Sequence, residues 1–403
     1  MKNKRILYIT SIWTAIKPII FEGKTEVNGM PGFWRPLEAL IKKGYQVDMI
    51  FYDEEEKYQK QDFNIRSPLF KKVNILTYLH VPKLSGWRKM FSNFNAYFKL
   101  KKVVETTLKQ QKYDFVYGQG PLSEVANRFC RKNNIPFGMR RYGDTLLSLI
   151  EQKGKLYAKL SRPIDYISML TPKDFMLATN DGSKVDELYQ LLNGSKQPYP
   201  LYFWINGVND PPISEQTVEL PKEPFLFYTA RIVRSKRQDK AIELLAKLKE
   251  QNIQIKLLLA GSKDEESFYL ELTKLIAKYD LANQVEFLGS KTQAELFQLA
   301  DAALASLAFY DDTNFGNCFI EYMKAGGCVI SLDDGSLDKV LKNNYNGFLV
   351  KDMSEAAEIV KKLYHDPVLV NQIKQAAKQT ADQTFYTWEE RIEKEIDLIE
   401  EYI

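Results

Sequence analysis

The sequence predicts an α/β protein of two doubly wound domains that face each other across a cleft. Three observations support this: the chain has 403 residues, short apolar runs alternate with helical patterns, and the alternation starts afresh near the middle. Such alternation is typical of parallel sheets, and at about 150 residues per domain the length predicts two to three domains. In such sheets ligands bind outside the carboxyl ends of the strands, and cofactor sites favour domain interfaces.

The first half is predicted to hold buried strands with helices in the gaps between them. Its apolar runs indicate strands at Arg5–Thr10, Gln46–Phe51, Phe115–Tyr117, Phe137–Arg140 and Met176–Thr179. Helical patterns follow at Arg35–Lys43 and Ser123–Asn133. A turn-rich stretch with several prolines, Asn206–Pro224, is the best linker candidate.

The second half repeats the alternation and ends in a helix. Strands are predicted at Phe225–Ala230, Ile255–Ala260, Val285–Leu288, Ala302–Leu307 and Cys328–Leu332, with helices at Gln238–Lys249, Glu266–Tyr279 and Gln293–Ala300. The acidic stretch Thr387–Ile403 carries Trp388 and three isoleucines on one helical stripe. We therefore predict domains at residues 1–212 and 213–384, followed by a terminal helix at 385–403.

Composition excludes several classes of protein. The chain is 45% hydrophobic and 27% charged, as in ordinary globular proteins, and its net charge of +4 is too small to imply a nucleic-acid partner. Three distant cysteines, Cys130, Cys318 and Cys328, support neither a disulfide framework nor a zinc site. No run approaches the roughly 18 apolar residues of a spanning helix, and the N-terminus lacks a signal-peptide cleavage site. We expect a cytoplasmic chain, soluble or peripheral at the inner face of a membrane.

The segment Arg66–Lys112 concentrates positive charge. It holds eleven lysines and arginines against one acid, Glu105, and its aromatic residues include Trp87, Phe91, Phe94, Tyr97 and Phe98. A basic, aromatic amphipathic segment is a candidate for binding an anionic membrane surface. The alternative is a helix that packs on the core and whose polar face is rich in lysine.

A basic cluster follows the first strand of the second half. Arg231, Arg234, Lys236 and Arg237 fall within seven positions. Guanidinium and ammonium groups at the end of a strand, beside a helix N-terminus, suit a diphosphate. The alternative is a solvated basic loop. Gly261, directly after the next strand, would let a ligand approach the bare backbone.

A turn before a short helix carries the third group of candidate residues. The N–H groups of Phe315, Gly316 and Asn317 are free to bind anionic or hydroxyl oxygens. Glu321 falls one turn inside the helix, where a carboxylate can accept both hydroxyls of a ribose and the helix N-terminus would keep it ionised. The alternative is a glutamate that only complements the helix dipole.

A dinucleotide-binding enzyme of the nicotinamide class is a poor match. Gly118 and Gly120 stand between a strand and a helix, but Ser123 occupies the third glycine position. The turn is also not the first strand-to-helix turn of the chain. A glycosidase would need two carboxylates about 5 to 10 Å apart, which a sequence does not show.

Further motifs extend over almost the whole chain in a fixed order. They are GMPG (Gly29–Gly32), NGV (Asn206–Val208), Arg231 with Lys236, Ala260–Gly261, VEFLGSKTQAELFQLADAALASL, FGNCFIEYMKAGG with NGFLV behind it, and the last helix. In this order and spacing the chain resembles the retaining glycosyltransferases of family 4, the glycosyl transferases group 1, which have the GT-B fold.

This resemblance implies a role for each motif. Arg231 and Lys236 would neutralise the diphosphate leaving group, so that no cofactor and no catalytic metal is expected. Glu321 would bind the ribose, and the amides of Phe315, Gly316 and Asn317 would contact sugar hydroxyls. Gly32 would let the first domain close over the phosphates, and the last helix would return to that domain. The acidic pairs Asp311–Asp312 and Asp333–Asp334 are then expected in surface turns.

Two positions depart from the family pattern. Thr313 stands where the first of two glutamates is common, and Tyr142, before Gly143 and Asp144, stands where a histidine is frequent. Tyr142 and Asp144 would then contact the acceptor or the donor sugar. The expected substrates are a nucleotide sugar, with uridine diphosphate the family's commonest carrier, and a surface or cell-wall glycan, including a lipid-linked one. The alternative is a non-catalytic subunit that binds glycan or stabilises a partner.

Overall fold

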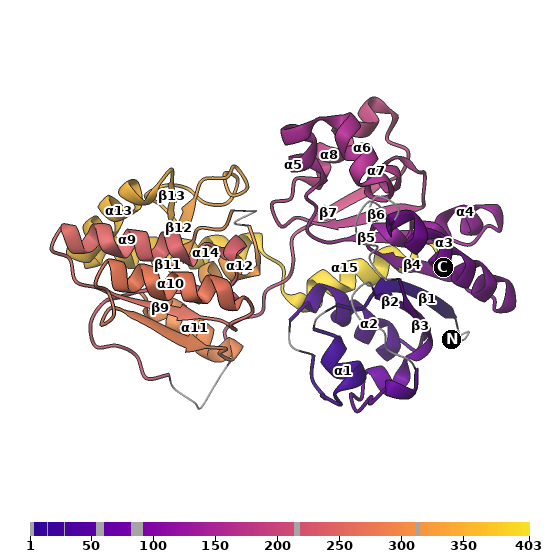
Figure 1. Ribbon diagram of the computed structural model, residues 1–403, viewed down its shortest axis with the longest axis horizontal. Helices are drawn as coiled ribbons and strands as arrows, with labels where there is room; N and C mark the ends of the chain where they lie inside the picture. Colours follow the sequence, from indigo (N-terminus) through magenta and orange to yellow (C-terminus); the bar gives the residue numbers. More distant parts are fainter. Residues whose placement is uncertain are drawn as a thin grey trace. The chain divides into compact units, whose positions relative to one another are not determined.

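The computed structural model describes residues 4–13, 15–27, 29–53, 60–81, 92–212, 218–311 and 315–403. The chain divides into two compact units (Figure 1). The first unit comprises Met1–Asn180, Lys184–Trp204 and Glu390–Ile403, and the second comprises Asp181–Ser183 and Ile205–Glu389. The division after Trp204 lies eight residues before the boundary that the sequence predicts, and the residues from Glu390 onward belong to the first unit.

The first unit is built on a parallel seven-stranded sheet in the order β3-β2-β1-β4-β5-β6-β7. Its strands are β1 (Arg5–Ser11), β2 (Gln46–Asp53), β3 (Asn74–His80), β4 (Phe115–Gln119), β5 (Phe137–Arg141), β6 (Phe175–Thr179) and β7 (Leu201–Trp204). Its helices are α1 (Lys17–Phe21), α2 (Pro31–Lys42), α3 (Ser92–Gln110), α4 (Glu124–Lys132), α5 (Leu146–Lys153), α6 (Lys155–Ser161), α7 (Pro163–Leu170) and α8 (Val185–Asn193), joined by most of α15 (Trp388–Glu400). Alternate residues of the strands face opposite layers: Leu7 and Ile9 pack with α3 and α4, whereas Tyr117 reaches α15.

The second unit repeats this plan with a parallel six-stranded sheet, in the order β10-β9-β8-β11-β12-β13. Its strands are β8 (Phe225–Thr229), β9 (Lys256–Ala260), β10 (Val285–Gly289), β11 (Ala305–Ala308), β12 (Val329–Leu332) and β13 (Phe348–Val350). Its helices are α9 (Gln238–Glu250), α10 (Glu266–Lys278), α11 (Gln293–Ala302), α12 (Asn317–Ala325), α13 (Met353–His365) and α14 (Pro367–Thr384).

Strand β8 shows why the second sheet is covered on both faces. Leu226 and Tyr228 belong to the core under α9, α10 and α13, whereas Phe225 and Phe227 belong to the core under α11, α12 and α14. All five residues of the strand are buried, so the apolar run is continuous rather than alternating. The predicted doubly wound architecture is therefore confirmed for each unit.

Helices α11 and α2 and strand β11 have other bounds than the sequence predicts. Helix α11 runs to Ala302, so β11 begins at Ala305 rather than at Ala302. Helix α2 begins at Pro31, because proline suits the first helical position, so Gly32 lies in the first turn of this helix rather than in a loop. Met30, directly before it, takes the left-handed conformation at φ 49°.

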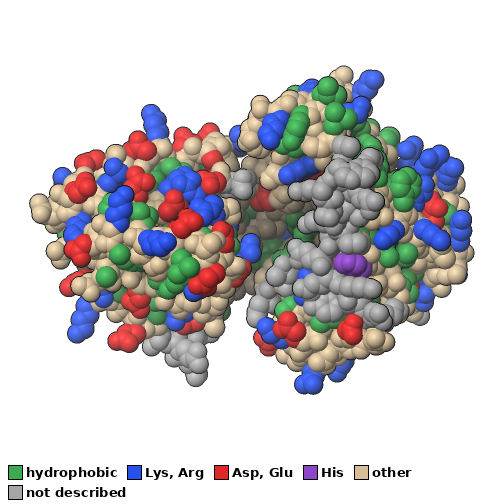
Figure 2. Space-filling model, in the orientation of Figure 1, with side chains coloured by type: hydrophobic (Ala, Val, Ile, Leu, Met, Phe, Trp, Pro, Cys, Tyr) green, Lys and Arg blue, Asp and Glu red, His purple; other side chains and the backbone are tan. Residues whose placement is uncertain are grey.

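The basic segment Arg66–Lys112 is not one amphipathic element, because it contains strand β3 and helix α3. Helix α3 buries Ala96, Leu100, Val104 and Leu108 against the core. Phe94 and Phe98 are 43% and 62% exposed, and Trp87 and Phe91 lie outside the described residues. Figure 2 shows Lys and Arg side chains gathered at the edge of the first unit where α3 and α4 lie. Helix α3 thus packs on the core with one face and presents lysines and two phenylalanines on another.

Candidate active site

In the second unit, the ends of β8 and β9 bring together two predicted positions. Arg231 follows β8 by two residues, and Gly261 directly follows β9. Gly261 has φ 150°, and a Cβ atom there would lie 1.9 Å from the carbonyl oxygen of Ala230. The glycine is therefore required because the two strand ends approach each other. This reason differs from the predicted one, that the bare backbone makes room for a ligand.

The two predicted diphosphate-binding side chains are held in different ways. Arg231 is an exposed residue with a side chain 63% accessible, and its Nη1 lies 3.2 Å from Oδ2 of Asp264. Lys236 is half-buried at the end of a short 3₁₀ turn, and its Nζ lies 3.8 Å from the centroid of the Tyr310 ring. Arg231 thus presents its charge at the surface, whereas Lys236 rests against an aromatic face.

The other two basic residues of the cluster form ion pairs with nearby carboxylates. Arg234 Nη2 lies 2.5 Å from Glu271 Oε1, and Arg237 Nη2 lies 2.9 Å from Asp239 Oδ2. For these two residues the structure matches the alternative of a solvated basic loop. Arg237 also has φ 48° and stands at the N-cap position of α9, where its side chain makes no capping hydrogen bond.

The N-terminus of α12 joins two motifs that are far apart in the sequence. Oδ1 of Asn317, the first residue of the helix, accepts a hydrogen bond of 2.9 Å from Nδ2 of Asn206. The first N–H groups of a helix have no partner within it, and a Cβ atom on Gly316 would meet open space. Phe315 is buried and packs on Phe319 at 5.7 Å between ring centroids. Thr313 lies outside the described residues.

Glu321 lies one turn inside α12, as the sequence predicts, but its ionisation differs from the expectation. Burial raises the pKa of the Glu321 carboxyl to about 7, although a hydrogen bond of 3.2 Å from Gln293 favours the charged form. Desolvation of this half-buried carboxyl therefore outweighs the helix N-terminus that was expected to keep it ionised. Near neutral pH the carboxyl takes up and releases a proton.

Tyr310 and Cys318 link Lys236 to Glu321, and neither was predicted. The Tyr310 ring contacts the Lys236 ammonium, and its hydroxyl interacts with the Cys318 thiol. Burial raises the pKa of Cys318 to about 11, and the nearby Glu321 charge adds to this effect. No sequence signal identifies Tyr310, because it follows β11, whereas Lys236 follows β8.

In the first unit the predicted residues Tyr142 and Gly32 contact each other. The Tyr142 hydroxyl lies 2.7 Å from Oε1 of Gln119 and 3.1 Å from the Gly32 carbonyl oxygen. Asp144 forms a short ion pair with Arg141, and its Oδ1 accepts a hydrogen bond of 2.7 Å from the Leu146 N–H at the start of α5. Both predicted contact residues are thus already engaged within the first unit.

A buried charged cluster lies beneath Tyr142. The Arg140 guanidinium is 4.6 Å from the centroid of the Tyr142 ring, and its Nε is 3.7 Å from Glu395 Oε2. The same carboxylate is 3.0 Å from Nη1 of Arg391 and accepts a hydrogen bond of 2.7 Å from Tyr117. Burial raises the pKa of Tyr142, so it stays protonated. This cluster attaches helix α15 to the sheet.

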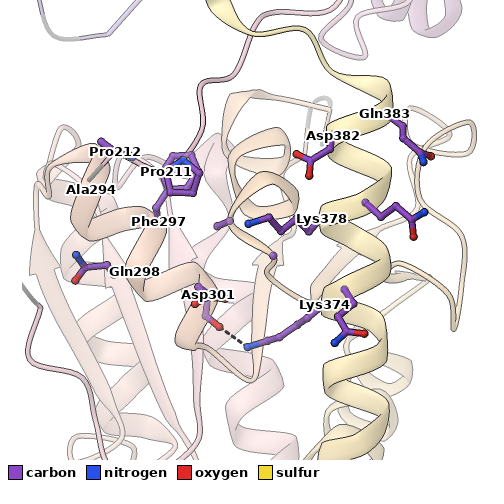
Figure 3. Close-up of a pocket in the computed structure, with 14 residues that line it drawn as sticks. Pro211, Pro212, Ala294, Phe297, Gln298, Asp301, Lys374, Lys378, Asp382 and Gln383 are labelled. Atoms are coloured by element: carbon purple, nitrogen blue, oxygen red, sulfur yellow. Dashed lines mark hydrogen bonds between the residues drawn. The ribbon is translucent and has the colours of Figure 1, made fainter. Parts of the chain in front are cut away.

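A groove of about 670 Å³ lies elsewhere on the second unit (Figure 3). It runs between α11 and α14: Phe297 and Gln298 line it from α11, and Lys374 and Lys378 line it from α14. Lys374 donates a hydrogen bond to the Asp301 carbonyl. Of the predicted site residues that the structure describes, none lines it. This groove is therefore separate from the predicted chemistry, and its residues supply control positions for mutagenesis.

The acidic pairs do not gather around a common point. Asp311 pairs with Arg237 and Lys240, while Asp333 and Asp334 accept backbone hydrogen bonds within their own turn. Among the residues that the structure describes, no three His, Cys, Asp or Glu side chains are placed to hold a metal ion. Asp312 is not among them. No described helix has the length and apolar character that crossing a membrane requires.

Comparison with known proteins bears on both units. Residues 209–380 match the family model of glycosyl transferases group 1. The chain is 26% identical over 309 residues to "Putative glycosyltransferase EpsD" of Bacillus subtilis (strain 168), covering 72% of this chain and 76% of the relative. The resemblance to the glycosyl transferases group 1 is therefore confirmed.

Two solved structures share the complete fold at low sequence identity. Sucrose-phosphate synthase from Thermosynechococcus elongatus superposes with a TM-score of 0.68 at 19% identity, covering 99% of this chain and 98% of that one. Anabaena Alr3699/HepE in complex with UDP-glucose superposes with a TM-score of 0.65 at 17% identity, covering 98% and 99%. The two doubly wound units are those of the GT-B fold.

Proposed function

Because residues 209–380 belong to the glycosyl transferases group 1, we propose that the protein is a retaining, metal-independent glycosyltransferase. It transfers a hexosyl or related sugar from a nucleoside diphosphate, most simply uridine diphosphate, to a hydroxyl of a surface or cell-wall glycan. One observation carries this proposal: Arg231 and Lys236 follow strand β8, and Glu321 lies one turn inside α12 of the same unit. This unit thus offers two cations and one carboxylate to a nucleoside diphosphate.

Arg231 and Lys236 stabilise the diphosphate leaving group. When the bond between the sugar and the diphosphate breaks, negative charge develops on the diphosphate oxygens, and fixed cations stabilise it. In the proposed reaction the acceptor hydroxyl attacks on the face from which the diphosphate departs, so the anomeric configuration is retained. The exposed Arg231 can reach such an anion, since its pair with Asp264 lies at the surface.

Glu321 binds the nucleoside, and the start of α12 binds the sugar. An ionised Glu321 accepts both ribose hydroxyls, while the N–H groups of Phe315, Gly316 and Asn317 bind sugar hydroxyls. Thr313 is assigned to the same sugar. The open space at Gly316 supports this role, because a ligand atom can approach the backbone there. In the first unit, Tyr142 and Asp144 are assigned to the acceptor or the sugar, and Gly32 is assigned to the donor phosphates.

We also propose that the protein associates with an anionic membrane surface at the cytoplasmic face, and the exposed face of helix α3 supports this. Phe94 and Phe98 are exposed one turn apart, and Lys99 and Lys102 are exposed beside them. Such a face suits the membrane that carries a lipid-linked acceptor. Sedimentation with vesicles that contain anionic lipid tests this: Phe94→Ser with Phe98→Ser should reduce binding, whereas Leu160→Ser, at another exposed apolar position, should not.

Thermal unfolding with nucleoside diphosphates and their sugar conjugates tests the donor assignment. A ligand at about 100 times its dissociation constant stabilises by about 2.7 kcal/mol, a shift of a few degrees. We expect the uridine series to stabilise the protein most. The internal engagement of Tyr142 and Asp144 favours a second candidate, a non-catalytic subunit. A folded protein that no nucleotide stabilises would support that candidate.

A further inference from the structure

Lys236 is held at both ends by tyrosines from different parts of the second unit. The Tyr228 hydroxyl donates a hydrogen bond of 2.6 Å to the Lys236 carbonyl oxygen and so fixes the backbone. The Tyr310 ring centroid lies 3.8 Å from the Lys236 ammonium nitrogen. The main chain between them is closed by a turn, in which the Lys236 N–H donates to the Val233 carbonyl at 2.9 Å. Contacts thus hold Lys236 both at its backbone and at its ammonium group.

Tyr310 is itself fixed to the sheet. Its side chain is 4% exposed, and its hydroxyl lies 3.1 Å from the carbonyl oxygen of Thr229, the last residue of β8. The Tyr310 ring also meets the Tyr228 ring edge-on, with centroids 5.9 Å apart. The two tyrosines therefore form one rigid support beneath Lys236, anchored at the strand end from which Arg231 also projects.

An aromatic ring can hold a cation in place without carrying a formal charge, whereas a carboxylate holds it by an opposite charge. The ring attracts the ammonium through its quadrupole but carries no formal charge. The contact with the Tyr310 ring therefore orders the long Lys236 side chain, and the ring itself brings no formal charge to the ammonium. Arg237 shows the other arrangement, because its guanidinium is paired with the carboxylate of Asp239. A cation that must meet an anionic ligand gains from being ordered beforehand, since less rotamer freedom is then lost on binding.

We infer that Tyr310 is a positioning residue for the diphosphate: its ring holds the Lys236 ammonium in place for the anionic phosphates of the donor. This inference rests on the proposed function. Tyr310 acts through Lys236, so its effect is confined to ligands that carry phosphate groups. Removal of the ring should therefore weaken binding of a nucleoside diphosphate and leave binding of the nucleoside alone unchanged.

Titration calorimetry of the full chain with uridine diphosphate and with uridine tests this directly. Tyr310→Leu removes the ring and should weaken binding of the diphosphate about tenfold, a typical effect for a desolvated cation–π contact. Tyr310→Phe keeps the ring and should restore affinity to within about twofold. Tyr279→Leu is the matched control, because Tyr279 contacts Lys278 in a similar pair on the same unit. It should change neither affinity.

A double-mutant cycle separates positioning from general damage. If Tyr310 acts through Lys236, Tyr310→Leu in the Lys236→Ala background should have no further effect on diphosphate affinity. Equal losses in both backgrounds would overturn the inference. Should Tyr310→Leu unfold, a series of fluorinated phenylalanines at position 310 keeps the shape while weakening the quadrupole. Affinity that does not fall along this series would also overturn it.

The same titrations distinguish this inference from the proposed function. A wild-type protein that binds none of the uridine, guanosine and adenosine diphosphates overturns the proposed function, and the inference with it. A wild-type protein that binds one of them, with Lys236→Ala weaker and Tyr310→Leu unchanged, overturns only the role of Tyr310.

Discussion

In the first unit, the charged side chains near the ends of the central strands are buried and bound to one another, whereas in the second unit they reach the surface. Glu395 joins Arg140 and Arg391 in the core of the first unit, and Asp144 is paired with Arg141. In the second unit Arg231 is largely exposed and Lys236 is half-buried. Buried pairs fix a structure but are closed to ligands, while exposed cations contribute little to stability and remain available. Substitutions in the two units should therefore have separable effects on stability and on activity.

The largest expected effect is on turnover, in the second unit. Arg231→Ala combined with Lys236→Ala removes both cations from the developing diphosphate charge and should lower kcat/KM by about 10³-fold or more. The melting temperature should change little, because both side chains are at least partly exposed. Sugar transfer from the donor that thermal unfolding selects measures the first effect. Lys378→Ala, on the groove of Figure 3, is the control. Near-normal turnover in the folded double variant would refute the diphosphate assignment.

The next effect is on stability, in the first unit. Glu395→Ala removes a buried carboxylate that contacts both Arg140 and Arg391 and should destabilise the protein by on the order of 3 kcal/mol. Denaturant unfolding measures this change. Glu393→Ala, at an exposed position of the same helix, should have an effect below about 0.5 kcal/mol. Equal stability of the two variants would show that the buried cluster does not hold α15 to the sheet.

A smaller effect depends on pH and concerns Glu321. Burial raises the pKa of its carboxyl to about 7, and only the ionised form accepts both ribose hydroxyls. Nucleoside diphosphate affinity should therefore be present above pH 7 and fall as the pH drops through 7, by at most about tenfold per pH unit. Calorimetry at several pH values measures the slope. Glu321→Gln cannot titrate, so the slope that remains belongs to the phosphates. The same slope in both proteins would exclude this role of Glu321.

The sequence predicts the central strands of both sheets and misses three at the edges. β3, β7 and β13 were not predicted as strands, and each ends a sheet. β7 is only partly buried along its whole length, and β3 is buried at Ile75 alone. An edge strand has one neighbour and one less protected side, so its sequence lacks the continuous apolar run that identifies β8. Burial does not explain every case: β10, the fourth edge strand, was predicted although none of its residues is buried, and β13 was missed although Phe348 and Val350 are buried.

The candidate site shows the same limit. Arg231, Lys236 and Glu321 could be found because each follows a predicted strand or a helix start. Tyr310 could not, because its contact with Lys236 depends on β8 and β11 being neighbours in the sheet. The prediction that the helix N-terminus keeps Glu321 ionised was also wrong, because the position in a helix can be read from a sequence and desolvation cannot.

The smallest expected effect follows from removal of the Tyr142 hydroxyl, which tests stability and activity in the same variant. Tyr142→Phe removes its contacts with Gln119 and Gly32 and should destabilise the protein by about 1 kcal/mol. Tyr199→Phe removes a similar buried hydrogen bond, to the Met169 carbonyl, and should cost about as much. If Tyr142 contacts the sugar as proposed, only Tyr142→Phe should also lower turnover, by about fivefold. Unchanged turnover in both variants would make Tyr142 a structural residue of the first unit. The tested residues of the first unit would then contribute to stability, and those of the second unit to the reaction.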